Sequence, residues 1–401
     1  MVETMSSNLP SARLKEIMEP IERPEVPIPG KTYRQLGVKL WGEGAYERES
    51  IDGIETKYKT LSKVQEKDIV VNKIWARNGT VAVVPENLSG CFVSGEFPSF
   101  SPIQDILEPR WFHWLTKTKE FWKQCDEKSQ GTSGKNRIRP EKFLEIEIPL
   151  PAIAEQRRIV ARIEELAARI EEARELRRRA AVEADALANK YAECLFNIYD
   201  CNLQSIESIC DVRGGIQKSM ERTPGANPRR YITVAHVQRN WIDISDPRYF
   251  EVSDEELERW RLHSGDVLVI EGNGSADQIG RTALFSGEIE DCVHQNHVIR
   301  IRPNPKWILP DYLNGFLNSP PGQKQMHERS RTTSGLFNLS VGRIKSINVP
   351  LTPLNDQQRI VINLREMRKK LDALKRHQAE TAAELDALLP AVLERAFRGE
   401  L

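Results

Sequence analysis

The sequence predicts an α+β protein organised as an internal pseudo-twofold repeat, in which two long helices separate two globular domains of mixed helix and strand. One motif occurs twice, and each copy opens a segment with a seven-residue apolar period, which is typical of long helices that pack on another helix. The rest of the chain consists of short β-rich runs between turns. The four predicted parts are a first domain at 1–147, a first helix at 148–200, a second domain at 201–347, and a second helix with the C-terminal tail at 348–401.

Composition narrows the class of protein further. The 401 residues carry 58 Lys and Arg against 58 Asp and Glu, so bulk electrostatics would not hold the chain on nucleic acid or on a membrane. No run approaches the ~20 apolar residues of a membrane helix, and residues 1–20 lack the apolar core of a secretory signal. Six cysteines without a C-x-x-C pair fit reduced thiols. We therefore expect a cytoplasmic protein with no membrane partner.

The globular segments alternate strand-like and helical runs. They match each other much less well than the helical segments do, which indicates a shared scaffold that carries two different surfaces. The strand-like runs lie at 68–71, 80–84, 265–270, 281–285 and 297–302, and the helical runs at 109–123 and 310–328.

The repeated motif keeps one displacement. The run Ile148-Pro-Leu-Pro-Ala-Ile-Ala-Glu-Gln-Arg-Arg-Ile-Val160 returns 201 residues later as Val349-Pro-Leu-Thr-Pro-Leu-Asn-Asp-Gln-Gln-Arg-Ile-Val361. The match continues without a gap to Phe196 and Phe397. The two segments are therefore copies of one structural element.

Both copies are predicted to be amphipathic helices. At about 1.5 Å per residue, a helix from residue 153 to 196 would be about 65 Å long. Because neither apolar stripe can remain in water, we expect the two helices to pack on each other; packing of each helix on its own domain is the alternative. The residues assigned to the coiled coil and to partner docking are Ile159, Ile163, Leu166, Ile170, Ile360, Leu364, Met367 and Leu371.

Three residues interrupt these stripes. One stripe position is polar in both copies, as Arg177 in the first and Gln378 in the second. This indicates either a solvated edge or a polar layer that sets the register. Pro390 should end or kink the second helix and leave residues 397–401 as a separate short element.

The sequence offers no catalytic or metal-binding constellation. Glycines at 272–280 fit neither the dinucleotide nor the Walker spacing, and a turn explains them better. Asp246-Pro-Arg-Tyr249 differs from the loop of amino-methyltransferases by an Arg in place of a Pro. Glu55-Thr-Lys57 resembles part of a nuclease site, but the second acid, Asp52, is too close in sequence for such a site. His294 and His297 would lie on opposite faces of a strand, so we expect no shared metal ion.

Two basic stretches without acids are candidate phosphate contacts. They lie at 128–139 and 329–345, immediately before each copy of the motif, and combine Lys and Arg with Gly, Ser and Thr amides. A solvated loop is the alternative, and recurrence in both halves favours function. The residues assigned to DNA here are Lys135, Arg137, Arg139, Arg331, Thr333 and Asn338.

Polar and aromatic residues near these stretches are candidates for reading bases. Arg, Asn and Gln side chains can pair bidentately with guanine or adenine edges, although each could also be an ordinary loop residue. In the first domain they are Lys73, Trp75, Arg77 and Asn78, and in the second Asn273, Gln278, Arg281, Gln295 and Asn296.

The duplicated motif followed by a long heptad helix resembles the specificity subunit of type I restriction-modification enzymes. Further similar stretches are Ser94-Gly-Glu-Phe-Pro98, Gln295-Asn-His-Val-Ile-Arg300 and Phe397-Arg-Gly-Glu-Leu401. Thr352 in place of Pro151 is a small departure. The resemblance implies two target recognition domains that each read half of an asymmetric bipartite site in double-stranded DNA, and an antiparallel helix pair that sets the half-site spacing.

The same resemblance assigns the chemistry to other chains. It implies two methyltransferase subunits docked on the helices and two restriction subunits that join them, with S-adenosylmethionine, ATP and Mg on those partners and no cofactor or catalytic residue on this chain. Two other functions stay open on the residues alone. One is a self-sufficient DNA-modifying enzyme, and the other is a protein-only coiled-coil adaptor.

If the helix pair acts as a ruler, one heptad inserted in both helices should lengthen it by about 10 Å. That length corresponds to about three base pairs of DNA rise. Mapping the methylated sites of the lengthened protein checks this, and an unchanged gap between the half-sites would contradict it.

Overall fold

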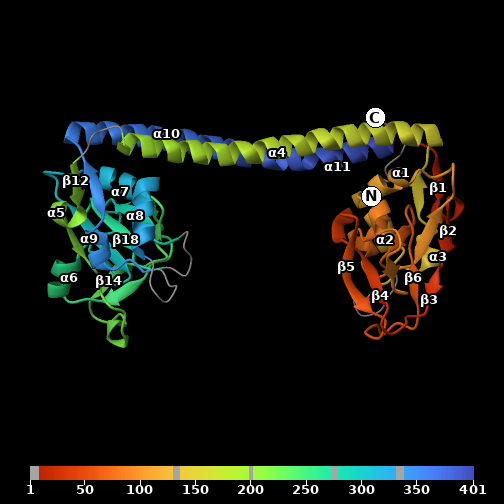
Figure 1. Cartoon of the computed structure of the whole chain (residues 1–401), viewed down its shortest axis with the longest axis horizontal. Coiled ribbons are helices and arrows are strands. Elements are labelled where there is room, and N and C mark those ends of the chain that lie inside the picture. The colour runs from red at the N-terminus through yellow and green to blue at the C-terminus, as the bar shows by residue number, and fades with distance from the viewer. Residues whose placement is uncertain (1–8, 130–135, 198–201, 273–277, 331–337) are drawn as a thin grey trace. The chain divides into compact units, whose positions relative to one another are not determined.

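A computed structural model describes residues 9–129, 136–197, 202–272, 278–330 and 338–401 (Figure 1). The chain divides into two units. Unit 1 comprises Met1–Arg177 with Ala379–Leu401, and unit 2 comprises Arg178–Gln378. The predicted four-part boundaries stay a prediction, because this division cuts through both long helical segments.

Unit 1 is built on a small antiparallel scaffold. A two-stranded sheet has the order β1-β11, and a four-stranded sheet has the order β2-β10-β7-β8. The strands are β1 (Ser11–Arg13), β2 (Met18–Ile21), β7 (Ile69–Val71), β8 (Val81–Val83), β10 (Ser99–Pro102) and β11 (Glu147–Pro149), and the helices are α1 (Pro109–Leu115), α2 (Lys119–Glu127) and α3 (Pro140–Phe143).

Unit 2 repeats this scaffold. Its sheets have the orders β12-β22 and β13-β21-β18-β19, and its helices α7, α8 and α9 begin 201 residues after α1, α2 and α3. The strands are β12 (Asn202–Ser205), β13 (Cys210–Arg213), β18 (Asp266–Ile270), β19 (Thr282–Phe285), β21 (Val298–Pro303) and β22 (Asn348–Leu351), and the helices are α5 (Ile206–Ile209), α7 (Pro310–Asn318), α8 (Pro320–Ser330) and α9 (Val341–Lys345). A shared scaffold is thus confirmed.

The remaining strands differ between the units. Unit 1 adds a five-stranded sheet of order β3-β6-β9-β4-β5, whereas unit 2 adds a β17-β14-β20 sheet and a β15-β16 hairpin. These elements are β3 (Pro24–Glu25), β4 (Thr32–Val38), β5 (Ala45–Asp52), β6 (Leu61–Lys63), β9 (Phe92–Val93), β14 (Pro228–Ile232), β15 (Val237–Gln238), β16 (Trp241–Ile242), β17 (Tyr249–Glu251), β20 (Val293–His294) and α6 (Asp254–Trp260). The two different surfaces predicted from the sequence are these additions.

Each predicted strand-like run contains a strand, but each helical run is split into two helices. The split falls at Thr118 in unit 1, whose side chain caps the N–H of Phe121, and at Ser319 in unit 2, immediately before Pro320. A capping threonine and a proline both favour a new helix start over continuation.

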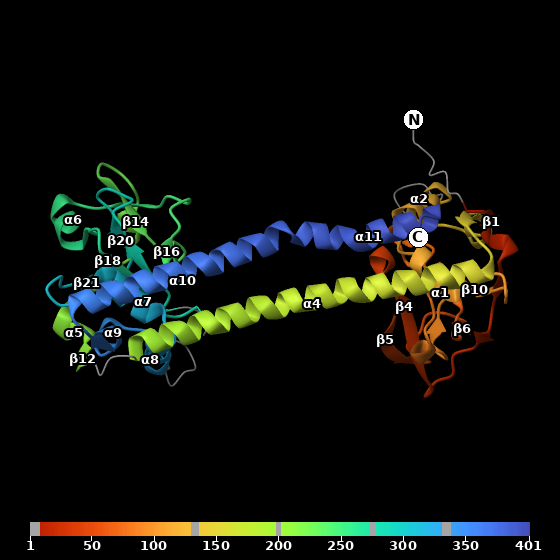
Figure 2. The ribbon, with the colours of Figure 1, turned by 90° about the horizontal axis from the view of Figure 1, so that it is seen from above.

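The long helices run antiparallel within each unit (Figure 2). They are α4 (Ile153–Asn197), α10 (Leu354–Glu380) and α11 (Ala382–Arg398). In unit 1, Arg174 forms an ion pair with Asp386 at 3.1 Å. In unit 2, Asp185 pairs with Lys375 at 2.7 Å. Within unit 1 the partner of α4 changes from Asp386 at Arg174 to Thr381 at Arg177, which is the antiparallel register.

The predicted helix end at Pro390, with residues 397–401 as a separate short element, is wrong. Pro390 lies inside α11, which runs on through Phe397 to an αL cap at Gly399, and the interruption falls at Thr381 between α10 and α11. Pro390 is exposed, so the carbonyl that loses its helical partner can remain hydrated. At the interruption, Arg177 donates to the carbonyl oxygen of Thr381 at 3.1 Å, which gives this polar stripe position a contact across the helix pair.

Each scaffold core is completed by the start of one long helix and the end of the other. In unit 1, the ring of Phe397 packs edge-on against Trp111 at 4.7 Å. In unit 2, Phe196 packs in the same way against Tyr312 at 5.3 Å. All four rings are nearly or fully buried. The helices are therefore parts of the domain cores as well as of the coiled coil.

A buried glutamine locks α4 to the scaffold of unit 1. This residue is Gln156. Its Nε2 donates to the carbonyl oxygens of Ile106 and Pro151, both at 2.8 Å, and its Oε1 accepts the N–H of Glu108 at 2.9 Å. Gln156 is fully buried, so these bonds satisfy loop and helix-start groups that water cannot reach.

Gln357 makes the same three bonds in unit 2. It donates to the carbonyl oxygens of Trp307 and Thr352, and it accepts the N–H of Leu309. The glutamine of the repeated motif is therefore the residue that attaches each long helix to the domain before it.

Replacing Gln357 by Leu should lower the unfolding free energy of unit 2 by about 2–4 kcal/mol, because three backbone groups then lose their only described partner. Unfolding in urea, monitored by the hydrogen exchange of the α7 amides, measures this free energy. Gln358→Leu is the matched control, since Gln358 is the exposed neighbour on the same helix. Equal stability of the two variants would contradict the role assigned to Gln357.

Candidate nucleic-acid interface

In unit 1 the β7–β8 connection meets the segment that precedes α3. The carbonyl oxygen of Lys73 accepts the N–H of Ile138 at 2.9 Å, and its Nζ donates to the carbonyl oxygen of Gly95 at 2.6 Å. Arg137 forms an ion pair with Glu96 at 3.5 Å. The fold thus brings together Lys73 and Arg137, which lie far apart in the sequence.

The other predicted residues of unit 1 surround this junction. Trp75 is exposed at the start of the 3-10 turn η3 (Ala76–Asn78), where Arg77 and Asn78 are half-buried. Arg139 is exposed at the N-cap of α3. Lys135 lies outside the described residues. Lys73, Trp75, Arg77 and Asn78 therefore lie in the β7–β8 connection, and Ile138, between Arg137 and Arg139, is bonded to it.

Unit 2 forms the same junction from different side chains. The carbonyl oxygen of Glu271 accepts the N–H of Leu339 at 2.5 Å, as Lys73 does for Ile138. Its carboxylate Oε2 lies 2.9 Å from Nδ1 of His297. Asn338 is exposed and bridges to Gly272, while Asn273, Arg331 and Thr333 lie outside the described residues.

Equivalent positions of the two junctions differ in charge. Glu96 and Arg137 of unit 1 become His297 and Asn338 of unit 2 at the displacement of 201, and Glu271 takes the place of Lys73. The junction of unit 1 therefore carries two basic groups and one acid, whereas that of unit 2 carries one acid and a histidine. Such a difference on one backbone frame can present different hydrogen-bonding groups to two DNA sequences.

Gln295 and Asn296 lie in the turn between β20 and β21. The backbone N–H of Asn296 donates to the carbonyl oxygen of Ile216, and Ile216 in turn donates to His294. A side chain at Gly215 would place its Cβ 2.2 Å from the His294 carbonyl oxygen, so this close approach requires glycine. The approach aligns Gln295 and Asn296 with the segment that follows β13.

Sequence reasoning missed the exposed pair Gln217 and Lys218 on that segment. The Gly214-Gly215 pair before them is the signal that could have indicated a tight approach of two backbone segments.

Arg281 is engaged within unit 2. Its Nη1 donates to Oε1 of Gln238 at 3.0 Å and its Nη2 to the carbonyl oxygen of Val234 at 3.2 Å. Burial lowers the pKa of Arg281. This guanidinium therefore braces the β15–β16 hairpin, whereas Gln278 beside it is exposed. DNA contact by these predicted residues of units 1 and 2 stays a prediction.

The residues considered for chemistry have structural partners. His294 is buried and its Nδ1 donates to the carbonyl oxygen of Val298 at 2.7 Å, whereas His297 is exposed. Arg248 pairs with Asp246, and Asp52 accepts the backbone N–H groups of Gly30 and Ile54. No cluster of three metal-binding side chains occurs among the described residues. No helix in the described part of the chain is long and apolar enough to cross a membrane.

The stripe residues assigned to docking fall into two groups. Ile159, Ile163 and Ile360 are almost fully buried in the domain cores, so they anchor the helices and offer no surface to a partner. Leu166 and Ile170 border an apolar groove of about 250 Å³ in unit 1, opposite Leu385, Leu388 and Val392 of α11. Leu364, Met367 and Leu371 border a cleft in unit 2.

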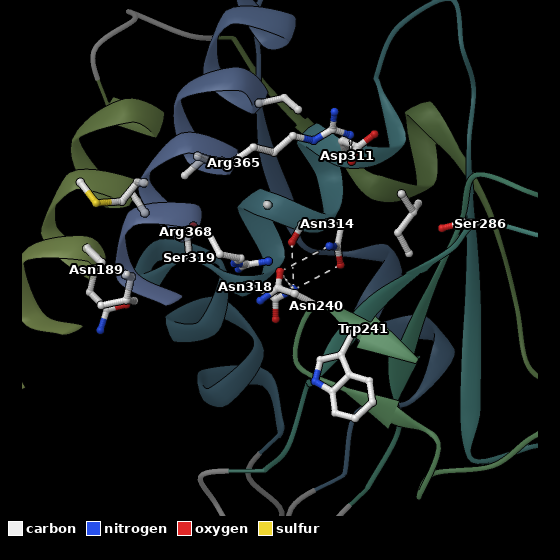
Figure 3. Close-up of a pocket in the computed structure, with 18 of the residues that line it drawn as sticks. Asn189, Asn240, Trp241, Ser286, Asp311, Asn314, Asn318, Ser319, Arg365 and Arg368 are labelled. Atoms are coloured by element: carbon white, nitrogen blue, oxygen red, sulfur yellow. Dashed lines mark hydrogen bonds and ion pairs between the residues drawn. The ribbon is translucent and has the colours of Figure 1, made fainter. Parts of the chain in front are cut away.

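The cleft in unit 2 has a volume of about 460 Å³ and lies between α7, the end of α4, α10 and β16 (Figure 3). Its wall on α7 is polar, because Asn318 donates to Oδ1 of Asn240 at 2.9 Å and to Oγ1 of Thr282 at 2.6 Å. An ion pair between Arg365 and Asp311 at 2.6 Å closes one side.

The chain matches the family model described as the type I restriction modification DNA specificity domain twice, over residues 12–178 and 203–382. The chain belongs to this family. The two matches cover most of both units, so the specificity domain is the repeated element and each unit contains one copy.

Curated relatives agree with the specificity domain assignment. The chain is 28% identical over 304 residues to the EcoKI specificity subunit of Escherichia coli K12, with 72% of this chain and 64% of that protein covered. It is 26% identical to the StySPI specificity subunit of Salmonella potsdam, with 74% and 66% covered. The matches span less than two thirds of these relatives.

Solved structures share the fold along nearly the whole chain. The HsdS subunit from Thermoanaerobacter tengcongensis is 23% identical with a TM-score of 0.64, and 98% of this chain and 97% of that chain are covered. A chain from a study of complex assembly and conformational transition of the type I R-M system is 23% identical with a TM-score of 0.71, with 98% and 100% covered.

Acidification should destabilise unit 2 through His294. Burial lowers the pKa of His294 to about 4, so between pH 6.5 and 4 the unfolded chain binds a proton that the folded chain does not. The unfolding free energy should therefore fall with pH across this window, by up to about 3 kcal/mol from this group.

Urea unfolding at pH 7 and pH 5 measures the change. His294→Asn retains an N–H donor and should show a smaller loss on acidification than the natural protein does. The comparison between variants also removes the contribution of His113, whose pKa is lowered to about 4 by burial. An undiminished loss in His294→Asn would refute the assignment.

Proposed function

We propose that this chain is the DNA sequence-specificity subunit of a type I restriction-modification complex. Each unit reads one half of a bipartite, asymmetric site in double-stranded DNA. The observation that carries the proposal is the pair of equivalent junctions with different side chains, Lys73 with Arg137 in unit 1 and Glu271 with His297 in unit 2. One frame with two sets of polar groups suits two different half-sites.

In this proposal the long helices set the half-site spacing and dock two methyltransferase subunits. Leu176, Val182 and Leu187 of α4 support docking, because at least half of each side chain is exposed on a helix already paired with another. Apolar surface of this kind favours a protein partner. Two restriction subunits then complete the complex.

The chain itself performs no chemistry in this proposal. Methylation with S-adenosylmethionine and ATP-driven, Mg-dependent cleavage belong to the partner subunits. This division is supported by the structural partners of the histidines and carboxylates: His294 and Asp52 are bound within their own turns, and His297 is bound by Glu271.

Sequencing the methylome of a methylation-free bacterial host tests the proposal. The host expresses the cognate methyltransferase with or without this chain. We expect N6-methyladenine at one bipartite motif only when the chain is present. A stable complex of the two proteins that produces no motif would refute DNA specificity and favour a protein-only adaptor.

A further inference from the structure

Unit 1 carries an exposed tryptophan on a strained turn. Trp41 lies in the 3-10 turn η2 (Leu40–Gly42) between β4 and β5, with φ 59° and ψ 30°. This left-handed region is unfavourable for a bulky side chain. The residue is nevertheless 54% exposed, so burial of the indole does not account for the strained position.

The scaffold holds this turn in place. The N–H of Gly42 donates to the carbonyl oxygen of Gly79 at 3.1 Å, and Nζ of Lys117 donates to the carbonyl oxygen of Gly42 at 2.8 Å. The ring of Trp41 rests against Trp122 with a centroid distance of 5.7 Å. A Cβ at Gly42 would lie 2.8 Å from the Cα of Lys117, which shows how closely the turn is pressed onto the scaffold.

Unit 2 builds a corresponding turn in its β15–β16 hairpin. Asn240 has φ 73°, and its N–H donates to the carbonyl oxygen of Thr282 at 2.8 Å. Its side chain accepts from Asn318, which follows Lys117 by the displacement of 201. Trp241 is 56% exposed, and Figure 3 shows its indole directed away from the asparagine cluster.

The two turns come from elements that the units do not share. Trp41 belongs to the β4–β5 connection of the five-stranded sheet, and Trp241 to a hairpin found in unit 2. Both nevertheless contact one equivalent scaffold position, which is Lys117 in unit 1 and Asn318 in unit 2. An exposed ring beside the same scaffold position, built from different segments, indicates a common role in the two units.

Both turns adjoin the candidate nucleic-acid interface. Gly79, which binds the first turn, ends the 3-10 turn that carries Arg77 and Asn78. In the second turn, Gln238 pairs with Trp241 across the β15–β16 hairpin, and its side chain accepts from Arg281, which is a predicted interface residue.

The charges beside the turns favour an anionic ligand. Burial and the nearby Arg110 lower the pKa of Lys117, and burial and the nearby Arg281 lower the pKa of Arg239. Cations that are partly desolvated and close to other cations gain when an anion such as a phosphate approaches. This favours DNA over a protein surface as the partner of the two rings.

We propose that Trp41 and Trp241 are a matched pair of DNA contacts, each of which packs its indole against a deoxyribose of its own half-site. The contact positions each unit on the duplex and is tolerant of sequence, because the sugar is the same at every position of the DNA backbone. This inference rests on the proposed function and adds to it two residues outside the predicted interface.

The test uses the full-length chain assembled with its methyltransferase and a labelled duplex that carries the methylated motif. Fluorescence anisotropy should show that Trp41→Ala and Trp241→Ala each weaken DNA binding about tenfold, as expected for the loss of one large apolar contact. The slope of affinity against salt should not change, because no charge is removed. Trp307→Ala is the matched control, since Trp307 is also 54% exposed but lies beside the Gln357 contacts.

A second variant separates the loss of the DNA contact from a loss of stability. Trp41→Gly removes the ring and also relieves the left-handed strain, so it should melt no lower than Trp41→Ala and still bind DNA about tenfold more weakly. Undiminished DNA affinity in the ring-deleted variants would overturn the proposal. Weaker methyltransferase association with undiminished DNA affinity would also overturn it and indicate a protein contact. Failure of the unsubstituted complex to bind the motif would instead refute the proposed function.

Discussion

The attachment of each long helix to a domain through one buried glutamine is the constraint on which the rest of the structure depends. Gln156 and Gln357 satisfy the backbone groups where a proline-rich entry, a helix start and a domain helix meet. Three polar groups that converge in a dry site cannot shift independently without leaving one of them unpaired. The helix direction is therefore set relative to the domain that precedes it, and the aromatic contacts of Phe397 and Phe196 can form in that frame.

The repeat preserves this attachment while other contacts around it vary. Arg110 pairs with Glu164 in unit 1, and the equivalent pair in unit 2 is Asp311 with Arg365, so the charges have exchanged places. An ion pair tolerates such an exchange because attraction depends on opposite sign and not on which partner carries it. A buried glutamine has no such freedom, since its donor and acceptor must each face one kind of backbone group.

Variation is concentrated on the surfaces that the scaffold presents. The additional sheets and the side chains at the two junctions differ between units, whereas the sheets below them keep one topology. A frame that is stable without its loops can change those loops at little cost in folding free energy. This separation explains how one chain can present two different polar surfaces and how the exposed turns with Trp41 and Trp241 arise from unrelated segments.

The sequence by itself determined the repeat, the strand-like runs and the long helices, because periodicity and a constant displacement are local properties of the chain. It also placed Lys73 and Arg137 as candidates, although only the fold brings them together. The tertiary structure alone decided that α11 continues through the exposed Pro390. It also decided that Arg281 binds the β15–β16 hairpin and that the motif glutamines attach the long helices to the domains. The turns that carry Trp41 and Trp241 contact equivalent scaffold residues, and this too was decided by the tertiary structure. These features depend on contacts between residues distant in sequence, whose partners no local pattern specifies.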